Sequence, residues 1–220
     1  MKSTTQIVKA IGITLLASCA TSRAEDWADK FYVHTDIGPA FISSRPTTSF
    51  GFDPGAGFIH KKGHFRADDG LRGDLALGYN LTKSFALETE AGVIWNSGPS
   101  IHDSFYQIPV MLNAVYQIQF SDSWKAYVGA GAGGVISMTH SEVLDYRFFT
   151  PFKYDDSDWS PGYQLEAGIK YALSSHAEVD LGYKFLDVAQ YTYSFRGIIR
   201  EEQVSNLVTH SPQLSFTWKF

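Results

Sequence analysis

The stretch from Leu71 to Leu81 has the sequence LRGDLALGYNL, in which apolar and polar side chains alternate. Successive side chains of a β-strand point to opposite faces of the sheet. One face of this stretch would therefore carry mainly leucine and tyrosine. The other face would carry, in order along the chain, Arg72, Asp74, Ala76, Gly78 and Asn80. Alternation of this kind predicts a strand with one apolar and one polar face.

Seven further segments of the 220-residue chain alternate in the same way. They are Phe31–Gly38, Phe85–Trp95, Tyr106–Gln117, Trp124–Gly133, Tyr163–Tyr171, Ala177–Phe185 and Gln213–Phe220. Short connections at 80–84, 119–123 and 174–176 fall between longer ones at 43–69, 96–104, 139–161 and 188–206. An even number of strands with this asymmetry of turns and loops is typical of a membrane barrel. We therefore predict an all-β fold, an eight-stranded antiparallel up-and-down transmembrane β-barrel.

A membrane barrel and a soluble barrel differ in which face of each strand points into the interior. The positions of the glycines indicate which face this is. Seven glycines share the charged face of the strands, at 78, 92, 129, 131, 133, 168 and 182. The interior of an eight-stranded barrel is only just wide enough for side chains. The glycine-rich, charged face should therefore be the confined inner one, and the apolar face should meet lipid. Aromatic residues near both ends of the apolar face predict girdles at the two membrane interfaces.

Ten charged residues are thereby predicted to point into the lumen. They are Arg72, Asp74, Glu88, Glu90, Glu166, Lys170, Glu178, Asp180, Lys184 and Lys219. Buried charges are tolerated when they are paired and hydrogen-bonded. We therefore expect a salt-bridge network that fills the lumen. The alternative is a narrow, cation-preferring channel, because acidic residues outnumber basic ones in this set.

The N-terminus has the form of a secretory signal. Lys2 and Lys9 precede a short apolar stretch that ends at Ala20. A small-x-small site then predicts cleavage after Ala24. The predicted division is a signal peptide at 1–24 and a barrel at 25–220. Lipidation of Cys19, the only cysteine, is the rival hypothesis. A chain cut after Ala24 keeps 15 of the 18 basic residues against 23 acidic ones, so we expect no nucleic-acid partner.

The final strand has the form of an outer-membrane assembly signal, with Leu214, Phe216 and Trp218 at alternate positions before the terminal Phe220. It is preceded by the segments FYQIPVMLNAVY (105–116), YVGAGAGG (127–134) and EVDLGYKF (178–185). In these features the chain resembles the outer-membrane β-barrel group that includes the opacity-type proteins and the OmpA-type barrel domain. The resemblance spans most of residues 30–220. It implies an outer-membrane location, structural or adhesive roles, and contact with lipopolysaccharide and the barrel assembly machinery.

No pattern in the chain predicts a catalytic site, a cofactor or a metal centre. His140-Ser141 and His210-Ser211 suggest a lipid A-modifying enzyme, but neighbours in a strand point to opposite faces. The aromatic-rich loops 139–161 and 188–206 could instead hold an extracellular ligand. The alternative is that the last four strands extend beyond the bilayer and these aromatic residues pack loop against loop. We therefore expect a non-enzymatic protein with a structural, envelope-integrity or adhesion role. A narrow channel is the first alternative, and a lipid A-modifying enzyme is the second.

Overall fold

The computed structural model describes residues 30–43, 45–53, 57–65, 67–98, 104–145, 150–195 and 200–220. The strands in this part of the chain are β1 (Phe31–Ile42), β2 (Arg45–Asp53), β3 (Gly57–Phe65), β4 (Gly70–Asn80), β5 (Phe85–Ser97), β6 (Ser104–Gln119), β7 (Trp124–Asp145), β8 (Thr150–Ala172), β9 (Ala177–Phe195) and β10 (Arg200–Lys219). None of the described residues belongs to a helix long and apolar enough to cross a membrane.

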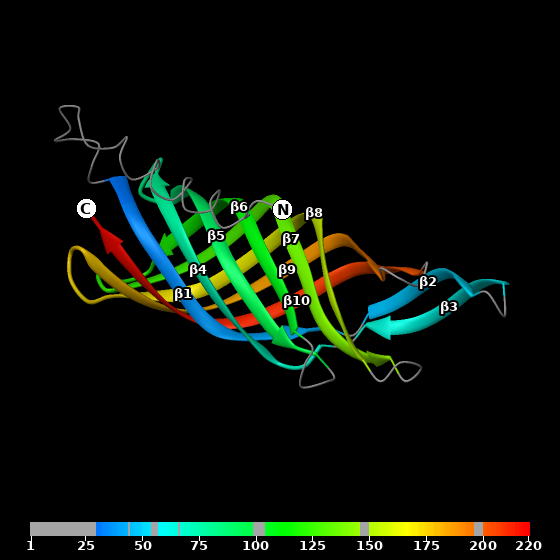
Figure 1. The fold of residues 1–220 in the computed structure, drawn as a ribbon. Coiled ribbons are helices and arrows are strands. Elements are labelled where there is room, and N and C mark those ends of the chain that lie inside the picture. Colours follow the sequence, from blue (N-terminus) through cyan, green and yellow to red (C-terminus); the bar gives the residue numbers. More distant parts are fainter. Residues whose placement is uncertain are drawn as a thin grey trace, which may run out of the picture.

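Eight of these strands close into a barrel (Figure 1). Their order around it is β1-β4-β5-β6-β7-β8-β9-β10, each antiparallel to the next. The first and last strands close the ring, in a register that runs from Tyr32 opposite Lys219 to Ile42 opposite Thr209. The prediction of a closed, eight-stranded antiparallel barrel is confirmed.

The long connection at 43–69, expected to be a loop, contains the hairpin β2–β3. β2 pairs with Arg200–Val204 of β10. It uses the same edge of β10 that β1 pairs with nearer the short turns, and it continues the register of that pairing. Inward-facing positions are even-numbered in β1 but odd-numbered in β2, where Thr47 and Ser49 are buried. Neither face of this hairpin follows the lipid-facing pattern of the barrel strands. The apolar–polar alternation that identified the other strands is therefore missing from its sequence.

The other long connections are also shorter than the sequence indicated. β7 and β8 remain paired as far as Asp145 opposite Thr150, and β9 and β10 as far as Phe195 opposite Arg200. Most of 139–161 and 188–206 is therefore strand, as the alternative of strands that extend beyond the membrane required. Backbone pairing needs no apolar face, so these strands continue past the point where the hydrophobic alternation fades.

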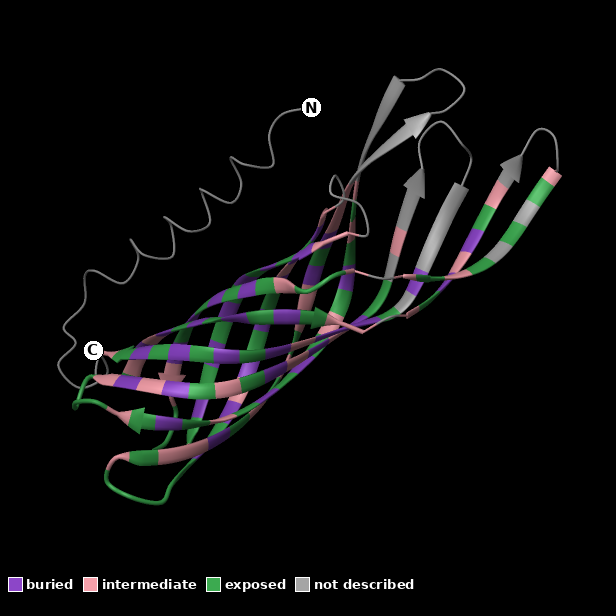
Figure 2. Cartoon of the chain, turned by 90° about the horizontal axis from the view of Figure 1, so that it is seen from below, coloured by how far each residue is buried: buried purple, intermediate pink, exposed green. Residues whose placement is uncertain are grey.

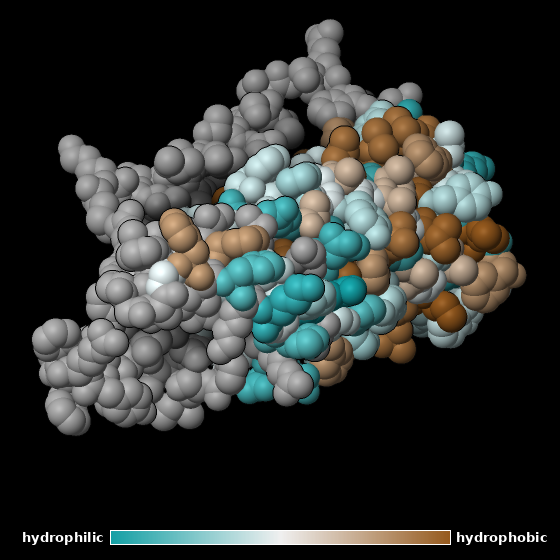
Figure 3. Space-filling model, turned by 90° about the vertical axis from the view of Figure 1, so that its right-hand side faces the viewer, coloured by the Kyte–Doolittle hydropathy of each residue, from teal (hydrophilic) through white to brown (hydrophobic). Residues whose placement is uncertain are grey.

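The pleat of the barrel strands separates two kinds of surface (Figure 2). Exposed and buried positions alternate along β5 almost from end to end. Leu112 and Leu181 on the outer face are 60% and 70% exposed, whereas Arg72 on the inner face is completely buried. Apolar side chains gather on the flank of the barrel seen in Figure 3. The outer face therefore suits a hydrocarbon environment and the inner face does not.

Aromatic pairs stand on the outer face at the short-turn end of the barrel. The rings of Phe31 and Tyr79 have centroids 4.8 Å apart, as do those of Trp124 and Tyr171. Each pair joins residues that face each other across neighbouring strands. Such rings are favoured at a membrane interface, where their apolar bodies and polar tips meet both environments.

Candidate functional site in the barrel lumen

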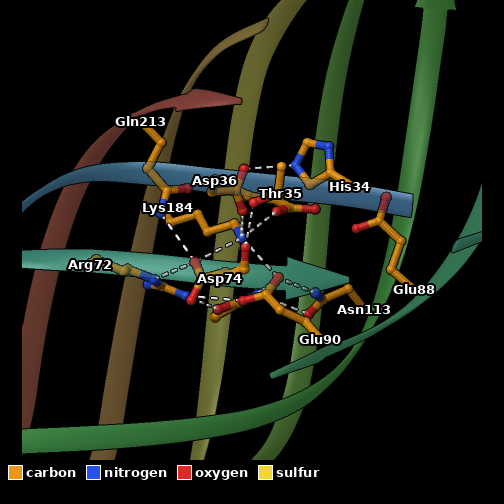
Figure 4. Close-up of polar contacts among 12 residues, drawn as sticks. His34, Thr35, Asp36, Arg72, Asp74, Glu88, Glu90, Asn113, Lys184 and Gln213 are labelled. Atoms are coloured by element: carbon orange, nitrogen blue, oxygen red, sulfur yellow. Dashed lines mark hydrogen bonds and ion pairs between the residues drawn. The ribbon is translucent and has the colours of Figure 1, made fainter. Parts of the chain in front are cut away.

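A network of ion pairs centred on Lys184 of β9 crosses the lumen (Figure 4). Its Nζ lies 2.5 Å from Asp36 Oδ2, 2.8 Å from Glu90 Oε2 and 3.2 Å from Asp74 Oδ2. These carboxylates come from β1, β5 and β4, so one ammonium group links four strands. The Lys184 side chain is 3% exposed, and its charge is balanced within hydrogen-bond distance.

A second cation, Arg72 of β4, extends this network toward β8. Its Nε donates to Asp74 Oδ2 at 2.7 Å, and its Nη2 donates to Glu90 Oε1 at 3.1 Å and to Gln164 Oε1 at 2.9 Å. The amide of Asn113 in β6 donates to Glu90 Oε2 at 3.0 Å. Together with Gln213 of β10, which donates to Asp74, seven of the eight barrel strands contribute a polar side chain.

β7 contributes space instead of a side chain at this level. A Cβ atom added to Gly131 would overlap the Oδ1 of Asn113, and one added to Gly129 would overlap the Glu166 side chain. These two glycines therefore leave the volume that the network occupies. This is the physical reason why glycines share a face with the charges in the sequence.

Two tyrosines and a histidine continue the polar interior toward the short-turn end. Tyr32 donates to Glu88 Oε1 at 2.5 Å, and Tyr127 donates to Asp180 Oδ1 at 3.0 Å. His34 Nε2 lies 2.7 Å from Asp36 Oδ1. The predicted set of inward residues held charged side chains only, and it omitted Asp36. The alternation that places Asp74 inside gives the same direction for Asp36 and His34, so the signal was present in the sequence.

Apolar side chains fill the lumen on the long-loop side of the network. Their cluster consists of Ala40, Ile94, Phe105, Met111, Val135, Leu186, Val188, Val204 and Leu207. Val204 and Leu207 are three residues apart, so a regular strand would point them to opposite faces. Asn206 between them has a positive φ of 49°, which lets both point inward. The lumen therefore has an ionic layer and an apolar layer. The sequence argument had considered only the ionic one.

The interior ends in a cavity of about 610 Å³ at the short-turn end. There Glu178 accepts hydrogen bonds from Lys125, at 2.7 Å, and from Lys219. The Lys219 side chain is 25% exposed, so it lies at the mouth of the lumen and not within it. Lys170 is deeper, with its Nζ 4.7 Å from the centroid of the Tyr127 ring.

Three carboxylates in the lumen are close enough to hold a metal ion. Ligand atoms of Glu88, Glu90 and Glu166 all lie within 4.8 Å of one another. Glu90, however, already accepts from Arg72 and Lys184 and from two side-chain amides. Among the described residues, we therefore assign this cluster to the ion-pair network and not to a metal site.

The structure separates His210 from Ser211, one of the two suggested Ser–His pairs. His210 Nε2 lies 3.2 Å from Ser43 Oγ, and its Nδ1 contacts the Tyr183 hydroxyl. Ser211 is buried, and its Oγ has no hydrogen-bond partner within the described part of the chain. The other suggested pair, His140-Ser141, includes a side chain that lies outside the described residues.

The remaining predicted residues lie at the two ends of the chain. Leu214, Phe216, Trp218 and Phe220 all point outward and are 39–58% exposed. Cys19 and Ala24 lie outside the described residues.

Taken together, these features define a class of protein. A closed antiparallel barrel with an apolar outer face, paired interface aromatics, an ionised interior and short turns at one end is a transmembrane β-barrel. The chain belongs to the Outer membrane protein beta-barrel domain family, whose model matches residues 11–220. This membership indicates an outer-membrane location.

Solved structures share this fold at low sequence identity. Neisserial surface protein A has a TM-score of 0.54 at 19% identity, over 87% of this chain and 97% of that one. OprG from Pseudomonas aeruginosa has a TM-score of 0.57 at 15% identity, over 88% and 98%. The protease OmpT from Escherichia coli has a TM-score of 0.51 at 9% identity, over 91% and 100%. No curated protein matches the sequence of the chain.

Proposed function

We propose that the protein is a non-enzymatic outer-membrane barrel with a closed lumen, which supports the envelope and presents its extracellular strands for surface contact. The observation that carries this proposal is the pair of layers across the lumen. An ion moving through the barrel would have to displace Lys184 from three carboxylates and then cross the layer around Ile94, Met111 and Leu186. Both steps are costly, because buried charges lose their partners and an apolar layer excludes water.

Conductance in planar bilayers tests the closed lumen directly. We expect the refolded protein to insert without producing discrete conductance steps. Faster gel migration of the unboiled sample, compared with the boiled one, provides the check that the inserted protein is folded. Steady, cation-selective steps from the folded protein would contradict the closed lumen and favour the narrow channel.

The surface-contact role is supported by exposed aromatics beyond the barrel. Phe58 of β3, in the hairpin outside the ring of barrel strands, is 92% exposed. Phe50 of β2 stacks on His60 across the hairpin, with ring centroids 4.8 Å apart. Exposed aromatic side chains that lie outside the lipid-facing band are typical of contact surfaces.

Attachment of bacteria that produce the protein tests this part of the proposal. We expect replacement of residues 46–64 by a short glycine turn to reduce attachment to host-cell or matrix surfaces without loss of barrel folding, since β1 closes the barrel against β4 and β10 without the hairpin. The matched control is Tyr116→Ala, which removes an exposed aromatic side chain from the outer face of β6. Unchanged attachment by the hairpin variant would count against the role. A changed lipid A mass spectrum would favour an enzyme instead.

A further inference from the structure

The cavity at the short-turn end of the barrel has a lining with one predominant charge. Five lysines line it, together with a single carboxylate: Lys30, Lys83, Lys125, Lys170, Lys219 and Glu178. The short turns of an outer-membrane barrel face the periplasm. We infer that this cavity is a periplasmic binding site for a small soluble anion that carries at least two carboxylate or phosphate groups.

Lys170 is the residue that distinguishes this cavity from an ordinary basic rim. Its side chain lines the cavity although the residue is only 2% exposed. Within the described part of the chain, no carboxylate forms an ion pair with it; its recorded contact is with the ring of Tyr127. A buried ammonium group without a carboxylate partner is costly, and a bound anion would supply that partner.

Two carboxylates of the inner face around this lysine accept hydrogen bonds from tyrosine hydroxyls. Tyr127 presents its ring face to Lys170 and donates its hydroxyl to Asp180, which lies opposite Lys170 on β9. Tyr32, which lines the cavity, donates its hydroxyl to Glu88. These carboxylates keep their charge, but each is held by its tyrosine and, among the described residues, neither forms an ion pair with Lys170.

The single carboxylate of the lining leaves an excess of positive charge. Glu178 is shared between Lys125 and Lys219, which are 22% and 25% exposed. Polar side chains between the lysines, including those of Asn80, Thr82, Gln117 and Gln119, can donate further hydrogen bonds. Separated ammonium groups suit oxyanions as point charges, and a volume of about 610 Å³ admits an organic di- or tri-anion.

Isothermal titration of the refolded full barrel in phosphatidylcholine nanodiscs tests the inference. The probes are citrate and inorganic pyrophosphate at low ionic strength, with glycerol as the neutral control. We expect one site per barrel and an affinity that falls with added salt. Repeating the titration with phosphatidylglycerol in the disc distinguishes the sources: weaker citrate binding there would assign the site to a lipid headgroup and overturn the soluble ligand.

Two substitutions with opposite expected effects make the test specific. Lys170→Met should weaken binding by about tenfold or more, the effect of losing one buried charge contact. Glu178→Gln should strengthen binding, because it removes the negative charge in the lining. Lys62→Met, at an exposed position of the β2–β3 hairpin, is the matched control and should bind as the unmodified protein does. If Lys170→Met fails to fold, Lys83→Met in the exposed turn replaces it, with a smaller expected loss. Binding that is absent, or equal in all variants, would overturn the inference.

Discussion

At the scale of the residue, the lumen is organised by how each buried charge is compensated. Lys184 is the main example, since one ammonium group faces Asp36, Asp74 and Glu90. Replacing the lysine or one of its carboxylates leaves an uncompensated charge in a dry interior. The free-energy cost of that charge is larger than the contribution of the intact ion pair. The stability of the barrel should therefore depend on this lysine more than on any lysine at its rim.

We expect Lys184→Met to lower the free energy of unfolding by about 3–5 kcal/mol, because three carboxylates lose their shared cation. Urea unfolding in lipid vesicles, followed by tryptophan fluorescence, measures this difference. Lys83→Met, in the exposed turn between β4 and β5, is the control and should be close to neutral. Equal stability of the two variants would show that the network contributes little to folding.

Gly131 allows the same interior to be tested by adding volume. We expect Gly131→Val to destabilise the barrel by about 1–3 kcal/mol, since its side chain would overlap Asn113 and strain the network. Ala132→Val is the matched control, because the next residue along β7 points outward and is exposed. The midpoint of urea unfolding measures both. A larger loss in the control would mean that the pleat of β7 is reversed.

At the scale of the element, each barrel strand has one face adapted to lipid and one adapted to the lumen. Leu165 of β8 is 49% exposed on the outer face, between Glu166 and Gln164, which point inward. A change of one position along the strand therefore exchanges a hydrocarbon environment for an ionic one. The contrast between these environments is the reason why substitutions on neighbouring positions should differ.

We expect Leu165→Arg to destabilise the inserted barrel by about 2–4 kcal/mol, the range for a cation on the lipid face near the midplane. Phe58→Arg on the extracellular hairpin is the control and should have little effect, because Phe58 is 92% exposed outside the barrel. Equilibrium unfolding in phospholipid vesicles provides the measurement. Tolerance of arginine at 165 would contradict the lipid-facing assignment of β8.

At the scale of the whole molecule, closure depends on the last strand. β10 pairs with β9 along most of its length and with β1 and β2 in succession on its other edge. We propose that the outward residues Leu214, Phe216, Trp218 and Phe220 are also recognised by the barrel assembly machinery, since they remain accessible on this closing strand.

We expect Phe220→Ala to reduce the amount of protein in the outer membrane of cells while refolding into lipid vesicles proceeds normally. Phe220 is 54% exposed and lies just beyond the end of β10, so its loss should not disturb the barrel pairing. Quantitative immunoblots of membrane fractions give the first value, and gel mobility before and after boiling gives the second. Normal accumulation in cells would remove the assembly role from this residue.

How much of this could be predicted differs between regions of the chain. The strand around Leu75 was predictable because lipid on one side and a crowded lumen on the other imprint alternation on the sequence. β2 and β3 were missed because that contrast is absent there. The apolar layer around Met111 was missed for a related reason. The residue type alone does not distinguish an apolar side chain that points into the lumen from one that points toward lipid.

The sequence by itself determined the number of barrel strands and the direction of their pleat, because both depend on a local period of two residues. Only the tertiary structure decided which charges meet. Asp36 and Lys184 are 148 residues apart and come together because the ring closes. The tertiary structure likewise decided that Asn113 occupies the space beside Gly131 and that a cavity lined by Lys170 forms at the short-turn end. These are distances between strands, and no periodicity within one strand encodes them.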